Sequence, residues 1–145
     1  MLNKKTLTKI KQYFARQKDV AVVYLYGSQV TGQSAKKEKD RDIDFAVLFI
    51  EPKKSYRRQF EIGAKLQKII GNKCVDCREI YPQISPVFLM NVLKNGRLIY
   101  SSDENKRIAF EVNIMREYED TQKLRDLQYF YLQKRLKEGK YANPN

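Results

Sequence analysis

The chain has 145 residues, a net charge of +12 and no histidine. The lack of histidine excludes a Ser-His-Asp triad, a Cys-His pair and a His-ligated zinc site, so catalysis would have to rest on carboxylates, lysine, tyrosine or a metal ion. The length suits one domain over residues 1–145, and the lack of a membrane-length apolar run or an apolar leader predicts a soluble, cytoplasmic protein.

The basic charge has two interpretations. It can keep a small protein soluble, or it can attract a polyanion such as RNA or an acidic protein surface. Lysine and arginine are spread along the chain, and no RNA-recognition motif accompanies them. We therefore expect general electrostatic attraction and no sequence-specific binding of nucleic acid.

The N-terminal part predicts a helix followed by a buried strand. Leu7, Ile10 and Phe14 recur at helical spacing, which indicates an amphipathic helix near residues 4–17. The apolar run at residues 20–26 then predicts the first strand of a sheet.

A Gly-Ser turn, Gly27-Ser28, follows this first strand directly. Gly27 lacks a Cβ, so the backbone can turn sharply there and a phosphate can approach it closely. Ser28 offers a hydroxyl and a backbone N–H at the expected start of a short helix, where N–H groups favour anions. We predict that these two residues bind the phosphates of a nucleotide.

An Asp-x-Asp pattern opens the second predicted strand, at residues 42–49. Side chains alternate along a strand, so Asp42 and Asp44 should share one face while Ile43 points into the core. Two adjacent carboxylates repel each other unless a cation lies between them, and hard oxygen ligands suit Mg²⁺. Either motif alone is common in structural turns, so the prediction of a metal and phosphate site rests on their joint occurrence.

The remaining strands and helices alternate, which predicts an α+β fold: a small mixed sheet of about four strands with helices packed on it. Turn and capping residues set the expected limits of these elements. After the second strand we expect a helix from Ser55 to Gly71, a strand at 73–80, a helix from Ser85-Pro86 to Asn95-Gly96, a strand at 98–100, and one long helix over about 102–139, capped by Ser101-x-x-Glu104.

Asp76 is a third candidate acid. On a strand next to the Asp-x-Asp strand it could complete a carboxylate triad and accept a proton from an attacking hydroxyl, although an exposed structural Asp is the simpler interpretation of the residue alone. Glu79 is a weaker candidate because its odd spacing puts it on the opposite face. Cys74 and Cys77 lack further ligands for zinc, and we expect them to be packing residues or incidental cysteines.

These patterns together resemble the minimal nucleotidyltransferases, or MNT-domain proteins, of the DNA polymerase β superfamily. The resemblance covers a core of about residues 20–100 and implies the polymerase-β-like fold, with ATP as substrate, Mg²⁺ as metal ion and Asp76 as the third acid. The spacer at 29–41 is longer than is usual for the family, which we interpret as a tolerated loop insertion. The matching residues are Gly27-Ser28, Gly32, Asp42-Ile-Asp44, Asp76 within Cys74-Val-Asp-Cys77, and Gly96-Arg-Leu-Ile-Tyr100.

Proteins of this family are typically antitoxin partners of HEPN-domain ribonuclease toxins, and some transfer AMP from ATP to a hydroxyl of the toxin. The resemblance implies that role here, with Gly27 and Ser28 on the triphosphate, Asp42 and Asp44 on Mg²⁺, Asp76 as third ligand or base, and a tyrosine as the expected acceptor. Two alternatives remain: an enzyme that adenylylates a small molecule such as an aminoglycoside, and an inactive antitoxin that acts by contact alone.

The predicted C-terminal helix carries more apolar surface than packing on one side requires. Its aromatic residues point around the helix, so we expect a second face to contact the partner protein, although packing within the chain is an alternative. These residues are Val112, Met115, Tyr118, Leu124, Leu127 and the run Tyr129-Phe-Tyr-Leu132.

Overall fold

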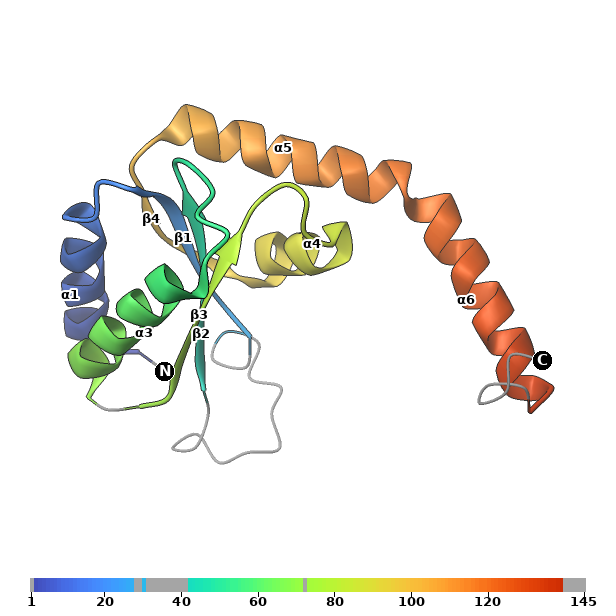
Figure 1. The fold of residues 1–145 in the computed structure, drawn as a ribbon, viewed down its shortest axis with the longest axis horizontal. Helices are drawn as coiled ribbons and strands as arrows, with labels where there is room; N and C mark the ends of the chain where they lie inside the picture. The colour runs from blue at the N-terminus through green and yellow to red at the C-terminus, as the bar shows by residue number, and fades with distance from the viewer. Residues whose placement is uncertain (1, 28–29, 31–41, 72, 140–145) are drawn as a thin grey trace.

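The computed structural model describes residues 2–27, 30, 42–71 and 73–139 (Figure 1). Ser28 of the predicted site therefore lies outside the described residues, as do Gly32 and most of the rest of the 29–41 spacer. No helix in the described ranges is long and apolar enough to cross a membrane. The elements are α1 (Lys4–Ala15), β1 (Val20–Tyr26), β2 (Ile43–Phe49), α3 (Tyr56–Ile70), β3 (Val75–Ile80), α4 (Pro86–Asn95), β4 (Arg97–Ser101), α5 (Glu104–Asp120) and α6 (Gln122–Lys137).

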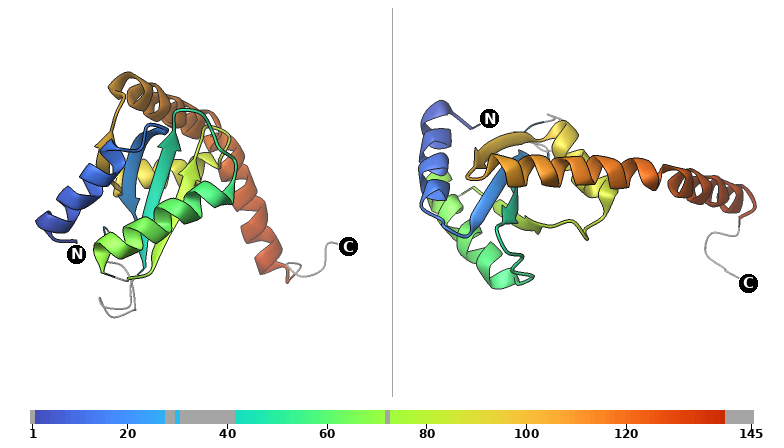
Figure 2. Two further views of the ribbon diagram at one scale, coloured as in Figure 1. Left: turned by 60° about the vertical axis from the view of Figure 1, so that its left-hand side comes forward. Right: turned by 90° about the horizontal axis from the view of Figure 1, so that it is seen from above.

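The four strands form one mixed sheet in the order β3-β2-β1-β4. β1 pairs antiparallel with both β2 and β4, whereas β2 and β3 run parallel. Helices α1 and α3 cover one face of the sheet, and α4 and α5 lie on the other (Figure 2). This arrangement confirms the predicted α+β fold with a four-stranded mixed sheet.

Two apolar clusters fill the spaces between the sheet and its helices. On the α1 and α3 side, Phe14 packs against Phe45 of β2, with 6.5 Å between ring centroids. On the other side, Leu89 of α4 and Ile114 of α5 are buried among side chains of β1 and β2. Because β1 and β2 feed both clusters, they are nearly continuous apolar runs without the alternation of a half-exposed strand.

Several predicted element ends are confirmed. Gly71 ends α3 with φ of 95°, a left-handed conformation that favours glycine, and Pro86 occupies the first turn of α4. Ser55 does precede α3, but its side chain makes no capping hydrogen bond.

The capping box predicted at Ser101 is wrong. Ser101 belongs to β4, and the hydroxyl of Ser102 donates to the carbonyl of Val20, 2.9 Å away. Asp103 caps α5 instead, because its carboxylate accepts a hydrogen bond from the Lys106 N–H at 2.9 Å. Ser101, Ser102 and Asp103 can each cap a helix. Because the pairing of β4 with β1 engages the two serines, Asp103 is the residue that caps α5.

The prediction of a single helix over 102–139 is also wrong, because the helix is interrupted at Thr121 and two helices, α5 and α6, form instead. The Thr121 hydroxyl donates to the carbonyl of Glu117 at 2.7 Å, and its backbone leaves helical geometry with φ of −90° and ψ of 1°. Hydrogen bonding of Thr back to the preceding turn favours such bends. Beyond this break α6 points away from the sheet (Figure 1).

The cap of α5 gives a test of the fold. We expect Asp103→Ala to lower the free energy of unfolding by about 1 kcal/mol, because a backbone N–H of the first turn loses its acceptor. Asp103→Asn is the matched control and should unfold like the wild type, since asparagine caps equally well. Equal urea midpoints for all three proteins would contradict the assignment of this cap.

Candidate functional site

Asp44 and Asp76 lie side by side on adjacent strands. The parallel register of β2 and β3 pairs Asp44 with Asp76, and the antiparallel register of β1 and β2 pairs Asp44 with Tyr26. Ile43 is fully buried in the cluster beneath α1 and α3, so Asp44 faces the opposite side, as predicted. Asp44 is half-buried and Asp76 is exposed, which leaves the pair open to a ligand.

Asp42 lies just before β2 and is half-buried. In residues 2–27, 30, 42–71 and 73–139, no three Asp, Glu or Cys side chains gather into a group that could hold a metal ion. The structure thus brings Asp44 and Asp76 together, and the triad that also contains Asp42 stays a prediction.

Gly27 forms the predicted turn at the end of β1. Its φ of 77° lies in the left-handed region, and a Cβ built there would overlap Oδ2 of Asp44. The Gly27 carbonyl accepts a hydrogen bond from the Val30 N–H at 3.1 Å, which closes the turn. Only glycine therefore lets the Asp44 carboxylate lie against this backbone. A phosphate bound at the turn would be next to this carboxylate.

The negative charge of the acidic pair affects the pKa of the neighbouring residue Tyr26. Burial, followed by the negative charges of Asp44 and Asp76, raises the pKa of Tyr26 to about 12, while Arg78 opposes this shift. The phenol thus stays protonated at neutral pH. A site that disfavours a further anion in this way favours a cation. Two carboxylates, which are hard oxygen ligands, beside the Gly27 turn would fit Mg²⁺ together with a nucleotide phosphate.

Arg78 is a site residue that the sequence reasoning missed. It follows Asp76 by two positions on β3 and so lies on the same face, and its Cζ is 4.2 Å from the ring centroid of Phe88 on α4. Phe88 in turn packs edge-on against Tyr26, with 5.6 Å between ring centroids. These contacts hold a guanidinium near the acidic pair, where it could contact a phosphate. The spacing from Asp76 was the signal in the sequence.

Glu79 has a structural role. Its side chain is 3% exposed and accepts hydrogen bonds from the backbone N–H groups of Lys53 at 2.6 Å and Lys54 at 2.8 Å. The prediction that Glu79 points away from the face of Asp76 is confirmed. Its carboxylate anchors the connection between β2 and α3.

Of the two cysteines, Cys74 is exposed and Cys77 is buried. Burial raises the pKa of the Cys77 thiol to about 12, so it is a poor nucleophile at neutral pH. Cys77 packs in the cluster beneath α3, as predicted for a packing residue.

The chain belongs to the polymerase β nucleotidyltransferase family, whose model matches residues 8–105. No curated protein matches it. Three similar solved structures are a tri-AMPylated Shewanella oneidensis HEPN toxin in complex with MNT antitoxin (TM-score 0.69, 20% identity, 91% of this chain and 99% of that chain), a toxin–antitoxin with AMP-PNP (0.69, 21%, 91% and 99%), and the toxin–antitoxin MntA-HepT (0.68, 20%, 90% and 99%). At these identities the similarity shows a shared fold.

The contrast between Glu79 and Asp76 can be tested by urea unfolding. We expect Glu79→Gln to lower the free energy of unfolding by about 1.5–3 kcal/mol, because a buried charged acceptor of two N–H groups is lost. Asp76→Asn should leave stability equal or higher, since it removes a negative charge beside Asp44. A large loss of stability in Asp76→Asn would show that Asp76 is a structural residue.

Proposed function

We propose that this chain is the antitoxin of a HEPN–MNT pair, which transfers AMP from ATP to a tyrosine hydroxyl of its cognate HEPN ribonuclease toxin and so neutralises it. The observation that carries the proposal is the pairing of Asp44 with Asp76 beside the Gly27 turn, in a chain of the nucleotidyltransferase family. Similar folds include an MNT antitoxin with an AMPylated HEPN toxin and a toxin–antitoxin with AMP-PNP. ATP-dependent silencing of a ribonuclease would take place in the cytoplasm.

In this proposal the Gly27 turn, together with Ser28, holds the triphosphate of ATP. Asp42 and Asp44 hold Mg²⁺, with Asp76 as a third ligand or as the base. When bound, Mg²⁺ would neutralise charge on the triphosphate and on the acidic side chains. Arg78 would offset part of the remaining phosphate charge.

The transfer itself is a substitution at the α-phosphorus of ATP. The acceptor oxygen forms a bond to that phosphorus, the bond from the α-phosphorus to the bridging oxygen breaks, and pyrophosphate leaves. The hydroxyl proton passes to the Asp76 carboxylate, the exposed acid next to Asp44. The chain needs no histidine for this proton transfer.

Mass spectrometry provides the main test. The product of the adjoining reading frame is purified and incubated with this protein, ATP and Mg²⁺, and it should gain the mass of one or more AMP groups. We expect Asp42→Asn and Asp44→Asn to abolish transfer, and Asp76→Asn to slow transfer by more than it weakens ATP binding. Excess chelator should abolish ATP binding in calorimetry, because the acidic pair then repels the triphosphate.

Asp103→Asn is the matched control for these variants, since it makes the same chemical change at a helix cap and should transfer at the wild-type rate. Transfer by Asp76→Asn at the wild-type rate would remove Asp76 from the mechanism. If the wild type silences its partner without any gain in mass, the protein acts by contact alone and the enzymatic proposal fails.

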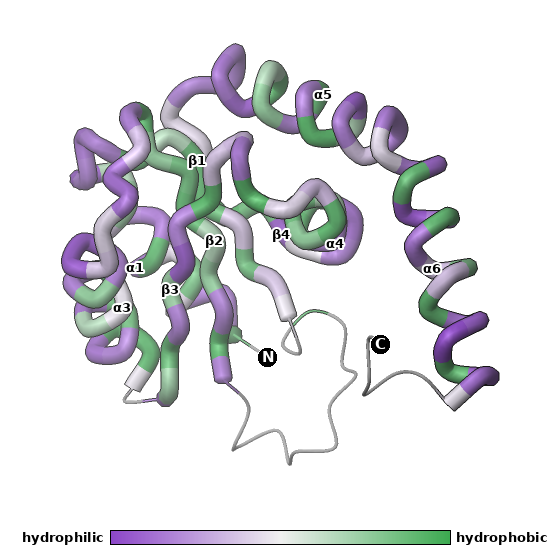
Figure 3. The backbone as a smooth tube through the Cα atoms, turned by 45° about the vertical axis from the view of Figure 1, so that its right-hand side comes forward, coloured by the Kyte–Doolittle hydropathy of each residue, from purple (hydrophilic) through white to green (hydrophobic). Residues whose placement is uncertain are grey.

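We further propose that α6 binds the toxin. This helix has no buried residue, and hydrophobic residues recur along its length (Figure 3). Tyr129, Phe130 and Tyr131 are 63%, 61% and 54% exposed, so the fold itself does not use them. A monomer rarely exposes so many large apolar groups on one element unless a partner covers them. The α6 apolar surface consists of Leu124, Leu127, Tyr129, Phe130, Tyr131, Leu132 and Leu136.

Alanine substitutions test this surface. Replacing Tyr129, Phe130 or Tyr131 should weaken toxin binding by about 1–2 kcal/mol or more at each hot spot, with little change in melting temperature. Phe110→Ala is the comparison variant, because Phe110 is buried and its loss should lower stability by about 3–5 kcal/mol. If the α6 variants lose stability in the free protein to a similar degree, those residues do not form an interface.

A further inference from the structure

The outer edge of β3 presents unpaired backbone groups. The Ile43 N–H donates to the Cys74 carbonyl at 3.0 Å, so the backbone groups of Cys74 and, by alternation, of Asp76 face β2. Those of Val75 and Cys77 must then face away from β2. β3 is an edge strand, and no strand in the described part of the chain pairs with that side.

One hydrogen bond supports this alternation independently. The N–H of Glu79, two residues after Cys77, donates outward to Oε1 of Gln59 on α3 at 3.1 Å. A helix side chain therefore occupies the edge at Glu79. The stretch around Val75 and Cys77 remains available to a further strand.

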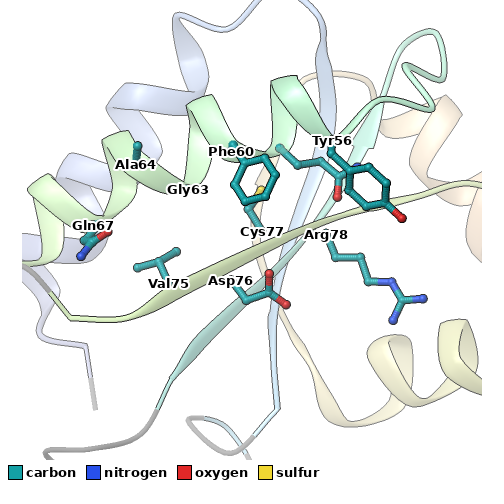
Figure 4. A pocket seen from close by; sticks show the side chains of 10 residues that line it. Tyr56, Phe60, Gly63, Ala64, Gln67, Val75, Asp76, Cys77 and Arg78 are labelled. Carbon is teal, nitrogen blue, oxygen red and sulfur yellow. The ribbon is translucent and has the colours of Figure 1, made fainter.

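A groove of about 510 Å³ runs along this edge between β3 and α3 (Figure 4). Tyr56 and Phe60 of α3 line it and are 77% and 74% exposed. Gly63 also lines it, with no side chain to fill the space. Figure 4 shows the aromatic rings on one side of β3, and Asp76 projecting on the other.

An exposed strand edge beside exposed aromatic rings is a site for strand addition. Asp76 indicates which kind of molecule occupies the groove, because it lines the groove and also pairs with Asp44 of the candidate site. A polypeptide added to β3 would therefore enter the candidate site directly. A nucleotide would not use the outward backbone groups of Val75 and Cys77, whereas an extended peptide would.

We propose that this groove binds an extended segment of the acceptor protein as an additional strand beside β3. Successive side chains of a strand point to opposite faces, so one set would lie against Phe60 while the alternate set lies beside Asp76. A residue directly across from Asp76 would have its Cβ about 4.5–5.5 Å away. The acceptor sequence is then a hydroxyl residue with an apolar residue on each side. This inference rests on the proposed function for the identity of the acceptor.

Amide hydrogen exchange measured by NMR tests the docking without requiring catalysis. The probe is the product of the adjoining reading frame, added in excess to this protein. We expect exchange at Val75 and Cys77 to slow at least tenfold in the complex, while Asp76, already bonded to β2, changes little. Complex formation with unchanged exchange at Val75 and Cys77 would overturn the inference. Protection of both amides in this protein alone, with a dimeric mass, would assign the edge to a second copy of the chain.

Kinetics supply the second measurement. Phe60→Glu should raise KM for the acceptor at least tenfold while ATP affinity and kcat stay near the wild-type values. Ile108→Glu is the matched control, because Ile108 is 49% exposed on α5 at the other face of the sheet, and it should leave KM unchanged. An unchanged KM in Phe60→Glu contradicts the groove. A wild type that transfers no AMP contradicts the proposed function instead, and the exchange result still decides on the groove.

Discussion

The register between β2 and β3 is the constraint on which the rest of this structure depends. It places Asp44 opposite Asp76, two like charges that would repel each other without a cation. A shift by one residue would turn Asp76 onto the opposite face of the sheet. The hydrogen bond from Ile43 to Cys74 and the burial of Cys77 beneath α3 hold the register on this strand. Packing of the apolar core thus offsets the repulsion between the two carboxylates and keeps them together.

Along each strand of the sheet, the residues that pack in the core and the residues of the candidate site occupy different positions. β2 and β1 are buried from both sides over most of their length, and the polar residues appear where β1 ends and β2 and β3 begin. Gly27 closes this end because its backbone touches the Asp44 carboxylate. Arg78, Phe88 and Tyr26 form the adjoining wall. The site is consequently built on rigid strands, with one tight turn against it.

Two surfaces carry large apolar side chains that the core does not bury. The α6 apolar surface extends away from the sheet, and the groove at the edge of β3 carries two exposed aromatic rings. They belong to segments that are far apart in the chain, because α6 follows the last strand whereas α3 lies between β2 and β3. A partner that contacts both would be held by α6 while an extended segment reaches Asp76. Such a division between anchoring and presentation would let binding survive the loss of catalysis.

The sequence by itself determined the features that depend on local geometry. Apolar periodicity placed the helices and strands, and the lack of a side chain identified Gly27 as a turn and Gly71 as a helix end, where the structure has positive φ. The alternation of side chains along a strand put Ile43 and Asp44 on different faces of the sheet, and likewise Asp76 and Glu79. Only the tertiary structure decided the strand order, the pairing of Asp44 with Asp76, the choice of Asp103 as cap, the break at Thr121 and the placing of Arg78 against Phe88. Those features arise from contacts between distant segments, in which several locally equivalent choices compete and long-range packing selects one.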